Sequence, residues 1–166
     1  DAQEPSQNNL ATINSFGVMV NYTGVSYPNL VGQQDEDGLL QTETACGGIF
    51  MFSREVYEQV GGFDEDLFLY HEDHDLSWRI RLGGWKLMVT PKSVCSHHYD
   101  FNKGVQKFYR SEKNRLHILL KNMESKTLVL ISPALIIVEL AQIFHALMHG
   151  WLGLKVKSYF EIFGQF

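Results

Sequence analysis

Apolar residues in the first fifty positions occur in short runs, separated by polar and glycine-rich segments. These runs predict strand and turn structure over 10–22 and a buried strand over 42–53. Within the second run, the pair Gly47-Gly48 would let the backbone approach another backbone or a ligand closely. The intervening segment 24–38 has no sustained period and predicts a loop, a structure that often serves as a lid in compact enzymes.

From Ser53 onward the spacing of apolar residues becomes helical. Ser53 is expected to cap a short helix that ends at Gly61. A second helix is expected over 72–82, with Leu76 and Ile80 facing inward and its arginines facing outward. Acidic residues crowd the start of this segment and basic residues its end, which is the order that the helix dipole favours.

Two further strands are expected over 85–89 and 93–98, followed by a helix over 105–120 whose basic residues lie away from its apolar side. The apolar stretch 128–154 then approaches the length of a membrane span, which needs about 20 residues. Its polar residues are spaced three or four apart and form one narrow stripe: Glu139, Gln142, His145 and His149.

The flanks of this apolar stretch fit a helix that stops at a lipid surface, with Pro133 near its start and Lys155 and Lys157 after its end. Three arrangements stay open at this point. The stretch could be a single span that hides its polar stripe against protein, an interfacial helix, or a buried core helix.

The composition fits one folded domain or part of one, with 166 residues, 45% hydrophobic residues and 13% aromatic residues. The net charge of -5 gives no sign of nucleic-acid binding. Cys46 and Cys95 lie in apolar, strand-like surroundings and are expected to be reduced, buried thiols. The polar start lacks the pattern of a signal peptide, and an opening Asp raises the possibility that the chain is a piece of a longer protein.

The segment 61–79 holds six carboxylates and two histidines among aromatic and aliphatic residues. Acidic side chains are rarely buried unless they are paired or hold a metal, so we expect a few of them at the rim of a pocket suited to acid/base or metal chemistry. Two interpretations stay even on the residues alone. Asp73 could face a cleft at the helix N-terminus as a base, or the acids could cap the helix and pair with Arg79 and Arg81.

An ordered series of motifs extends this segment in both directions: Gly47-Gly48, Arg54-Glu55-Val56, Gly61-Gly62-Phe63-Asp64-Glu65, Phe68, Tyr70, Glu72-Asp73, Asp75-Leu76, Arg79, Gly84, Pro91 and His97. Together they closely resemble the C-terminal half of the family-two inverting glycosyltransferases, over about residues 12–122. The resemblance implies an α/β fold over 1–122, namely the acceptor-side part of a GT-A domain that lacks most of the N-terminal nucleotide-binding half. Residues 123–166 would follow as a membrane-proximal helical tail.

The resemblance also implies a site. Glu72-Asp73 would be the catalytic pair, with Asp73 as the general base on the acceptor hydroxyl. His97, with His98 as the neighbouring alternative, would help to hold a divalent cation, Mg²⁺ or Mn²⁺. The positions implied in donor or acceptor binding are Gly47, Gly48, Asp75, Arg79 and Lys113, the last in a Lys-Asn pair where many relatives have Arg-Asn.

The chemistry of an inverting displacement agrees with such a site, because it needs one carboxylate base and no protein nucleophile. Charge grows on the departing diphosphate, and a divalent cation with oxygen or imidazole ligands would neutralise it. Relatives carry an upstream Asp-x-Asp that holds this metal. Here Asp35-Glu36-Asp37 has the spacing but lies in a polar loop, so we expect most of the donor site to be missing from this chain.

Three functions are compatible with the sequence. The first is part of an inverting glycosyltransferase, peripheral or anchored at the inner, cytoplasmic face of the cell membrane, acting on a nucleotide-sugar donor and a saccharide or lipid-linked acceptor in polysaccharide biosynthesis. The second is a non-catalytic, membrane-associated module of the same fold that binds a saccharide or a protein. The third, with the least support, is an independent metal hydrolase.

Overall fold

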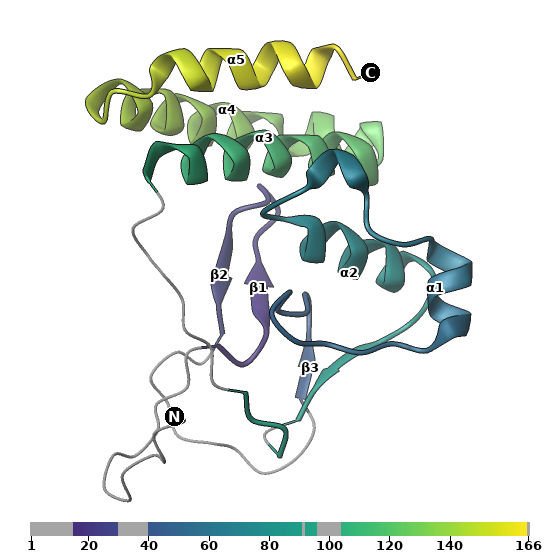
Figure 1. Cartoon of the computed structure of the whole chain (residues 1–166). Helices are drawn as coiled ribbons and strands as arrows, with labels where there is room; N and C mark the ends of the chain where they lie inside the picture. The colour runs from purple at the N-terminus through teal and green to yellow at the C-terminus, as the bar shows by residue number, and fades with distance from the viewer. Residues whose placement is uncertain (1–14, 30–39, 91, 96–103, 166) are drawn as a thin grey trace, which may run out of the picture.

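The computed structural model describes residues 15–29, 40–90, 92–95 and 104–165, which form a mixed, helix-rich α/β structure (Figure 1). The strands are β1 (Val18–Val20), β2 (Ser26–Pro28), β3 (Leu40–Thr42) and β4 (Leu87–Val89). The helices are α1 (Arg54–Val60), α2 (Glu72–Leu82), α3 (Gly104–Asn122), α4 (Ser125–Met148) and α5 (Leu152–Phe163), and a 3-10 turn, η1, covers Glu65–Leu67. The predicted α/β class is confirmed at this level.

The strands form two antiparallel pairs, β1 with β2 and β3 with β4, and a bridge between Val18 and Thr44 links them. In the β1–β2 hairpin, the side chain of Asn21 accepts hydrogen bonds from the backbone N–H groups of Thr23 and Val25, at 2.9 and 3.2 Å. Asn side chains commonly stabilise turns in this way. Strand β2 lies in the segment that we predicted as a loop, so that part of the prediction is wrong.

The run of apolar residues after β3 is not a buried strand. Residues 45–53 have no regular structure, and the side chain of Met51 is 94% exposed. Cys46 and Cys95 are also exposed, which corrects the prediction of buried thiols. Of the strand expected over 93–98, only residues 93–95 are described, and they are not in a strand. Apolar composition alone misled here, because a short run can be either a strand or an exposed coil.

Helices α1 and α2 begin and end close to the predicted positions. The Ser53 hydroxyl accepts from the Val56 backbone N–H at 3.3 Å, and Gly61 follows α1 with φ 75°. Val56, Leu76 and Ile80 form a buried cluster between the two helices, flanked by partly buried aromatic and aliphatic residues. Burying such side chains contributes about 1.5–3 kcal/mol each, so this cluster fixes α2 against α1.

Helices α3, α4 and α5 lie alongside one another on one side of the molecule, and the β1–β2 hairpin and α2 lie below them (Figure 1). The apolar stretch predicted over 128–154 is divided at Gly150, whose φ is 74°, so α5 turns back as a separate helix. The prediction that Lys155 lies at a lipid surface is wrong, because its side chain is 0% exposed. Gly150 has the left-handed conformation that glycine adopts readily.

Four charged side chains are packed between these three helices. Arg115 of α3 pairs with Glu112 at 3.0 Å and with Glu139 of α4. Lys155 of α5 lies 2.9 Å from both Glu112 and Glu139. We call these four residues the buried charge cluster. Arg115 also donates to the carbonyl oxygen of Thr23 at 2.8 Å, which ties the tip of the β1–β2 hairpin to the helices.

Candidate active site

The turn that leads into α2 contains two consecutive residues with left-handed backbone conformation, Tyr70 at φ 70° and His71 at φ 66°. Residues other than glycine rarely adopt such values unless surrounding contacts hold them there. Asn114 of α3 supplies these contacts, because its Nδ2 donates to the carbonyl oxygens of Leu67, Leu69 and Tyr70 at 2.8, 3.0 and 2.7 Å. Helix α3 therefore fixes the turn that places the first residues of α2.

Asp73 lies in the first turn of α2 and is held by two backbone groups. Its Oδ2 accepts from the Gly47 N–H at 2.7 Å, and its Oδ1 accepts from the His74 N–H at 2.8 Å. Two residues before Gly47, the N–H of Ala45 donates to the Ser77 hydroxyl at 3.0 Å. A Cβ at position 47 would lie 2.9 Å from Oδ2, so the close approach of this coil to α2 requires a glycine.

Burial raises the pKa of the Asp73 carboxyl, while hydrogen bonds from the Gly47 and His74 backbone oppose that rise. The residue is only half-buried, so the carboxylate is within reach of a ligand. A carboxylate with a raised pKa is a stronger proton acceptor than an ordinary aspartate. The geometry and the electrostatics both suit Asp73 to accept a proton from a hydroxyl group.

Glu72 is the preceding residue and differs from Asp73 in its contacts. Burial raises the pKa of Glu72, and the neighbouring charge of Asp73 adds to the rise. Its Oε2 is buried and has no hydrogen-bond partner within the described residues. A buried polar atom without a partner costs free energy, so Glu72 is the carboxylate of the pair that has most to gain from a ligand hydrogen bond.

Two histidines, His71 and His74, flank Glu72 and Asp73 in the chain. Nδ1 of His71 is 3.2 Å from Nδ1 of His74, and Nε2 of His71 is 3.1 Å from the hydroxyl of Ser111 on α3. Burial lowers the pKa of His74 to about 4 and that of His71 to about 3. Both rings are therefore neutral at neutral pH, and they link the start of α2 to α3 without adding charge near Asp73.

Asp75 and Arg79, predicted to bind donor or acceptor, make contacts within the protein. Asp75 is 0% exposed and accepts from Arg79 at 2.9 Å, from Lys121 at 3.2 Å and from Asn122 at 2.8 Å. Arg79 does not face outward as we expected, because it also donates to two carbonyl oxygens at the end of α1 and in the next turn, at 2.6 and 2.8 Å. The alternative expectation, that acids of this segment pair with Arg79, is confirmed for Asp75, and a ligand-binding role for either residue stays a prediction.

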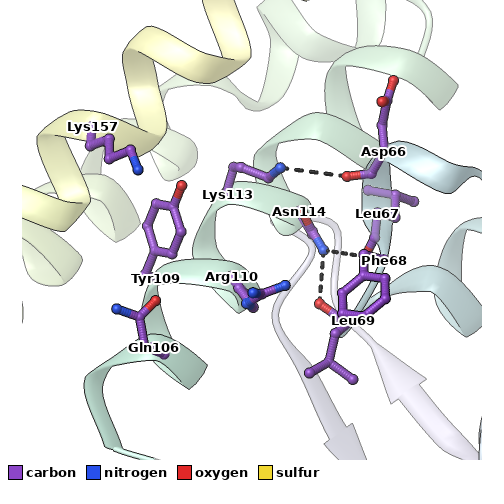
Figure 2. Close-up of a pocket in the computed structure, with 10 residues that line it drawn as sticks. All are labelled: Asp66, Leu67, Phe68, Leu69, Gln106, Tyr109, Arg110, Lys113, Asn114 and Lys157. Atoms are coloured by element: carbon purple, nitrogen blue, oxygen red, sulfur yellow. Dashed lines mark hydrogen bonds between the residues drawn. The ribbon is translucent and has the colours of Figure 1, made fainter.

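The remaining predicted binding residues lie on two sides of this turn. Gly47 contacts Asp73, and Gly48 is exposed in the same coil. Lys113 lies on α3, where it lines a pocket of about 290 Å³ between the turn 66–69, α3 and α5 (Figure 2). The structure thus brings Gly47 and Asp73 together, while Lys113 faces a separate hollow on the other side of the turn that Asn114 holds.

The predicted metal ligand His97 and its alternative His98 lie outside the described residues. Within 15–29, 40–90, 92–95 and 104–165, no group of three or more His, Cys, Asp or Glu side chains is placed to hold a metal ion. The residues that the structure describes therefore do not form a metal centre by themselves. The divalent cation stays a prediction that rests on the resemblance, and no chemical step below depends on it.

Comparison with known proteins supports the glycosyltransferase resemblance. A family described as "N-terminal domain of galactosyltransferase" matches residues 33–103, the segment that contains Gly47 and Asp73. Polypeptide N-acetylgalactosaminyltransferase 3 of Homo sapiens is 31% identical over 87 residues, which are 48% of this chain and 14% of that protein. No solved structure matches the chain.

Two bacterial proteins are similar over shorter stretches. N-acetylglucosaminyl-diphospho-decaprenol L-rhamnosyltransferase of Mycobacterium tuberculosis is 38% identical over 58 residues, which are 35% of this chain and 19% of that protein. Rhamnosyltransferase WbbL of Escherichia coli is 37% identical over 68 residues, which are 39% of this chain and 26% of that protein. The matched part of the chain spans between 14% and 26% of the length of these three relatives.

These matches show that part of the chain is similar to glycosyltransferases. The predicted resemblance to GT-A-type glycosyltransferases of family two is confirmed. The matched family is described as an N-terminal domain of a galactosyltransferase. This match supports the similarity to glycosyltransferases, but it does not test whether the chain is the C-terminal, acceptor-side half of a GT-A domain, which stays a prediction.

Sequence reasoning missed the part that α3 plays in this site. Asn114 lies four residues before the buried Ile118, on the inward side of α3, and is itself 2% exposed. A polar residue at an inward helical position needs hydrogen-bond partners, and this signal was available from the periodicity. His71 and His74 contact each other, and His71 contacts Ser111, as expected for histidines whose hydrogen bonds are satisfied within the protein.

Proposed function

We propose that this chain is the acceptor-side part of an inverting glycosyltransferase, in which Asp73 is the general base. Asp73 would take the proton of an acceptor hydroxyl as that oxygen attacks the anomeric carbon of a nucleotide sugar. The carbon–oxygen bond to the nucleotide diphosphate breaks in the same displacement, and the nucleotide diphosphate leaves. The observation that carries the proposal is the half-buried carboxylate of Asp73, held by the Gly47 and His74 N–H groups.

Two features of Asp73 support this role over that of a helix cap. Each carboxylate oxygen accepts one backbone hydrogen bond and so keeps a lone pair for a proton. The turn that presents it has two left-handed residues fixed by Asn114, and such strain collects at functional sites. Orientation by fixed backbone groups also lowers the entropic cost of aligning a base with its substrate.

We further propose that the protein acts at the cytoplasmic face of a membrane through α4. This helix is long and apolar enough to cross a membrane, with a mean hydropathy of 2.1 in its most apolar window. A core helix of a soluble protein passes the same test, but it would be mostly buried, whereas 0% of this window is buried within the described structure. A lipid surface would cover these side chains.

A lipid-linked saccharide is the acceptor that fits this location. The mycobacterial relative is named for a substrate with a diphospho-decaprenol lipid, which is consistent with such an acceptor. The donor would be a nucleotide sugar, bound largely by residues outside this chain.

The test replaces the base and leaves the fold intact. If this chain is a piece of a longer protein, the whole protein is used. Asp73→Asn should lower the rate of sugar transfer by at least ~100-fold, because general bases typically contribute 10²- to 10⁴-fold, while donor affinity changes less than about twofold. Glu58→Gln, which removes an exposed carboxylate from α1, is the matched control and should leave both quantities unchanged.

Transfer at the original rate by Asp73→Asn would overturn the assignment of the base. A second candidate is the non-catalytic saccharide- or protein-binding module of the same fold. It predicts that the whole protein transfers no sugar from any nucleotide donor, so the same assay separates the two candidates.

A further inference from the structure

The pocket between the turn 66–69, α3 and α5 brings together three cationic side chains. Arg110 and Lys113 lie one turn apart on α3, and Lys157 comes from α5 (Figure 2). The pocket volume is about 290 Å³, which leaves room for a small polar group. Three positive charges around one hollow are unexpected in a chain whose net charge is -5, so their position needs an explanation.

The contacts of these cations leave positive charge available. Lys113 has a carbonyl oxygen of Asp66 at 3.5 Å, and Arg110 lies 5.4 Å from the centre of the Phe68 ring. Neither contact neutralises a charge. Lys157 is 3.4 Å from the carboxylate of Glu161.

The carboxylates near the pocket do not neutralise its positive charge. Asp66 lines the pocket, and Glu161 accepts from the hydroxyl of Tyr109 at 2.5 Å in addition to its contact with Lys157. Two carboxylates therefore face three cations, and the local charge stays positive. Arg and Lys side chains bind phosphate groups through charge-assisted hydrogen bonds, which an excess positive charge in a hollow favours.

Exposed apolar side chains lie in the turn that lines the pocket and on α5, one helical turn from Lys157. Phe68 is 78% exposed and Leu69 is 40% exposed in the lining turn. Phe160 follows Lys157 by one helical turn on α5 and is 75% exposed. A ligand with a phosphate group and a hydrocarbon chain would bind both surfaces at once. Its phosphate would contact the cations, and its hydrocarbon chain would contact the exposed apolar residues.

The turn that lines the pocket also leads directly to the candidate base, Asp73. The carbonyl oxygens that Asn114 holds belong to Leu67, Leu69 and Tyr70, the first two of which line the pocket. Asp73 follows three residues after Tyr70. A ligand whose phosphate occupied this pocket would therefore contact the turn that positions the base.

We propose that this pocket binds the phosphate or diphosphate of a lipid-linked saccharide, the acceptor of the proposed reaction. This inference rests on the proposed function and adds the group by which the acceptor is recognised. Arg110 and Lys113 are binding residues for the acceptor in this assignment, and the exposed aromatic residues of the turn and of α5 contact the start of its lipid chain.

The test measures vesicle binding by the full 166-residue chain. One set of phosphatidylcholine vesicles contains a polyprenyl diphosphate, and a second set contains phosphatidylglycerol at matched surface charge. The wild-type chain should bind the diphosphate vesicles at least ~10-fold more tightly, the gain expected from one or two charge-assisted hydrogen bonds. The double variant Arg110→Gln/Lys113→Gln should lose that preference.

The matched control is Arg54→Gln/Lys86→Gln, which removes one Arg and one Lys from exposed positions far along the chain from the pocket. This variant should keep the preference, and circular dichroism checks that both double variants fold. Equal binding to the two sets of vesicles would overturn the proposal in favour of non-specific charge attraction, as would a preference that the pocket variant retains.

Soluble uridine diphosphate separates a lipid source of the diphosphate from a nucleotide source. If it competes with the diphosphate vesicles and its binding is lost in the pocket variant, the pocket belongs to the donor and the acceptor assignment is wrong. The assay does not depend on chemistry at Asp73, so Asp73→Asn should bind the vesicles as the wild-type chain does. A failed transfer assay and a failed pocket assay are therefore distinguishable.

Discussion

In the α1–α2 region the cluster packed between the helices is apolar, whereas in the α3–α5 region three charged side chains, those of Glu112, Arg115 and Lys155, are buried beside apolar ones. Val56, Leu76 and Ile80 make the first cluster. In the second region Arg115 is 2% exposed and Lys155 is 0% exposed, while apolar side chains of α4 lie outside, with Ile137 68% exposed. The α3–α5 region thus differs in two ways: its interior contains charged side chains as well as apolar ones, and α4 exposes a row of aliphatic side chains.

The difference indicates whether water or another surface is expected to cover each region. An apolar cluster under a polar exterior is stable in water by the hydrophobic effect alone. A helix that exposes many aliphatic side chains, as α4 does, needs another surface to cover them. The candidate base lies in the first region, and the positive pocket lies where the two regions meet. That arrangement is consistent with the proposed binding of a lipid-linked acceptor near the candidate base.

The largest expected effect comes from the buried charge cluster of the α3–α5 region. Lys155→Met leaves Glu112 and Glu139 buried with Arg115 as their remaining cationic partner in the cluster. Removing one member of a buried ion pair typically costs 3–5 kcal/mol, so the free energy of unfolding should fall by about that amount. Chemical denaturation followed by circular dichroism measures it.

The control for this substitution is Lys157→Met, two residues along α5, where the side chain is 59% exposed. A surface change of this kind should alter the free energy of unfolding by less than about 0.5 kcal/mol. A loss below about 1 kcal/mol for Lys155→Met would mean that the cluster does not hold the three helices together.

The next effect concerns the outer face of α4. Replacing Ile137, Leu140 and Phe144 by Gln removes three exposed apolar side chains from one side of the helix. Burial of each would contribute about 1.5–3 kcal/mol, so even partial burial in lipid predicts a loss of about 100-fold in binding to phosphatidylcholine vesicles. Sedimentation with the vesicles measures the loss.

A matched triple variant tests whether vesicle binding depends on the surface of α4 or on exposed apolar area anywhere in the protein. Ile49→Gln/Met51→Gln/Leu82→Gln removes three exposed apolar side chains from α2 and from the coil before α1. It should bind vesicles as the wild-type chain does. An equal loss of vesicle binding in the two triple variants would show that α4 is not the surface that binds lipid.

The smallest effect is a pH dependence at the start of α2. Because burial lowers the pKa of His74 to about 4 from 6.5, the folded state favours the neutral ring. Its contribution to stability is present above pH 6.5 and is lost as the pH falls towards 4. Between pH 7 and pH 5, His74 alone should account for a loss of about 2 kcal/mol in the free energy of unfolding.

His74→Gln should lose less stability than the wild-type chain over that pH interval, as measured by denaturant titrations at several pH values. His149→Gln, which changes an exposed histidine at the end of α4, should keep the full dependence. If His74→Gln showed the same pH dependence as the wild-type chain, burial of the ring would not be the cause.

Much of the helical structure was predictable because its signals are local. The Ser53 cap, the Gly61 end and the bounds of α2 follow from residues within one turn of each position. The resemblance to glycosyltransferases was equally readable, because it depends on residue identities in order. The short strands were predicted poorly, since three-residue strands carry little pattern and their pairing joins residues far apart, as between β3 and β4.

The sequence by itself determined the helices, the acidic segment and the Glu72-Asp73 pair, since periodicity, caps and motifs are written in neighbouring residues. Only the tertiary structure decided that Asp73 meets Gly47, that Asn114 fixes the turn before it, and that Lys155 is buried among carboxylates. Each of these contacts joins residues at least 16 positions apart in the chain. Their partners depend on how helices and coils pack, which no local pattern specifies.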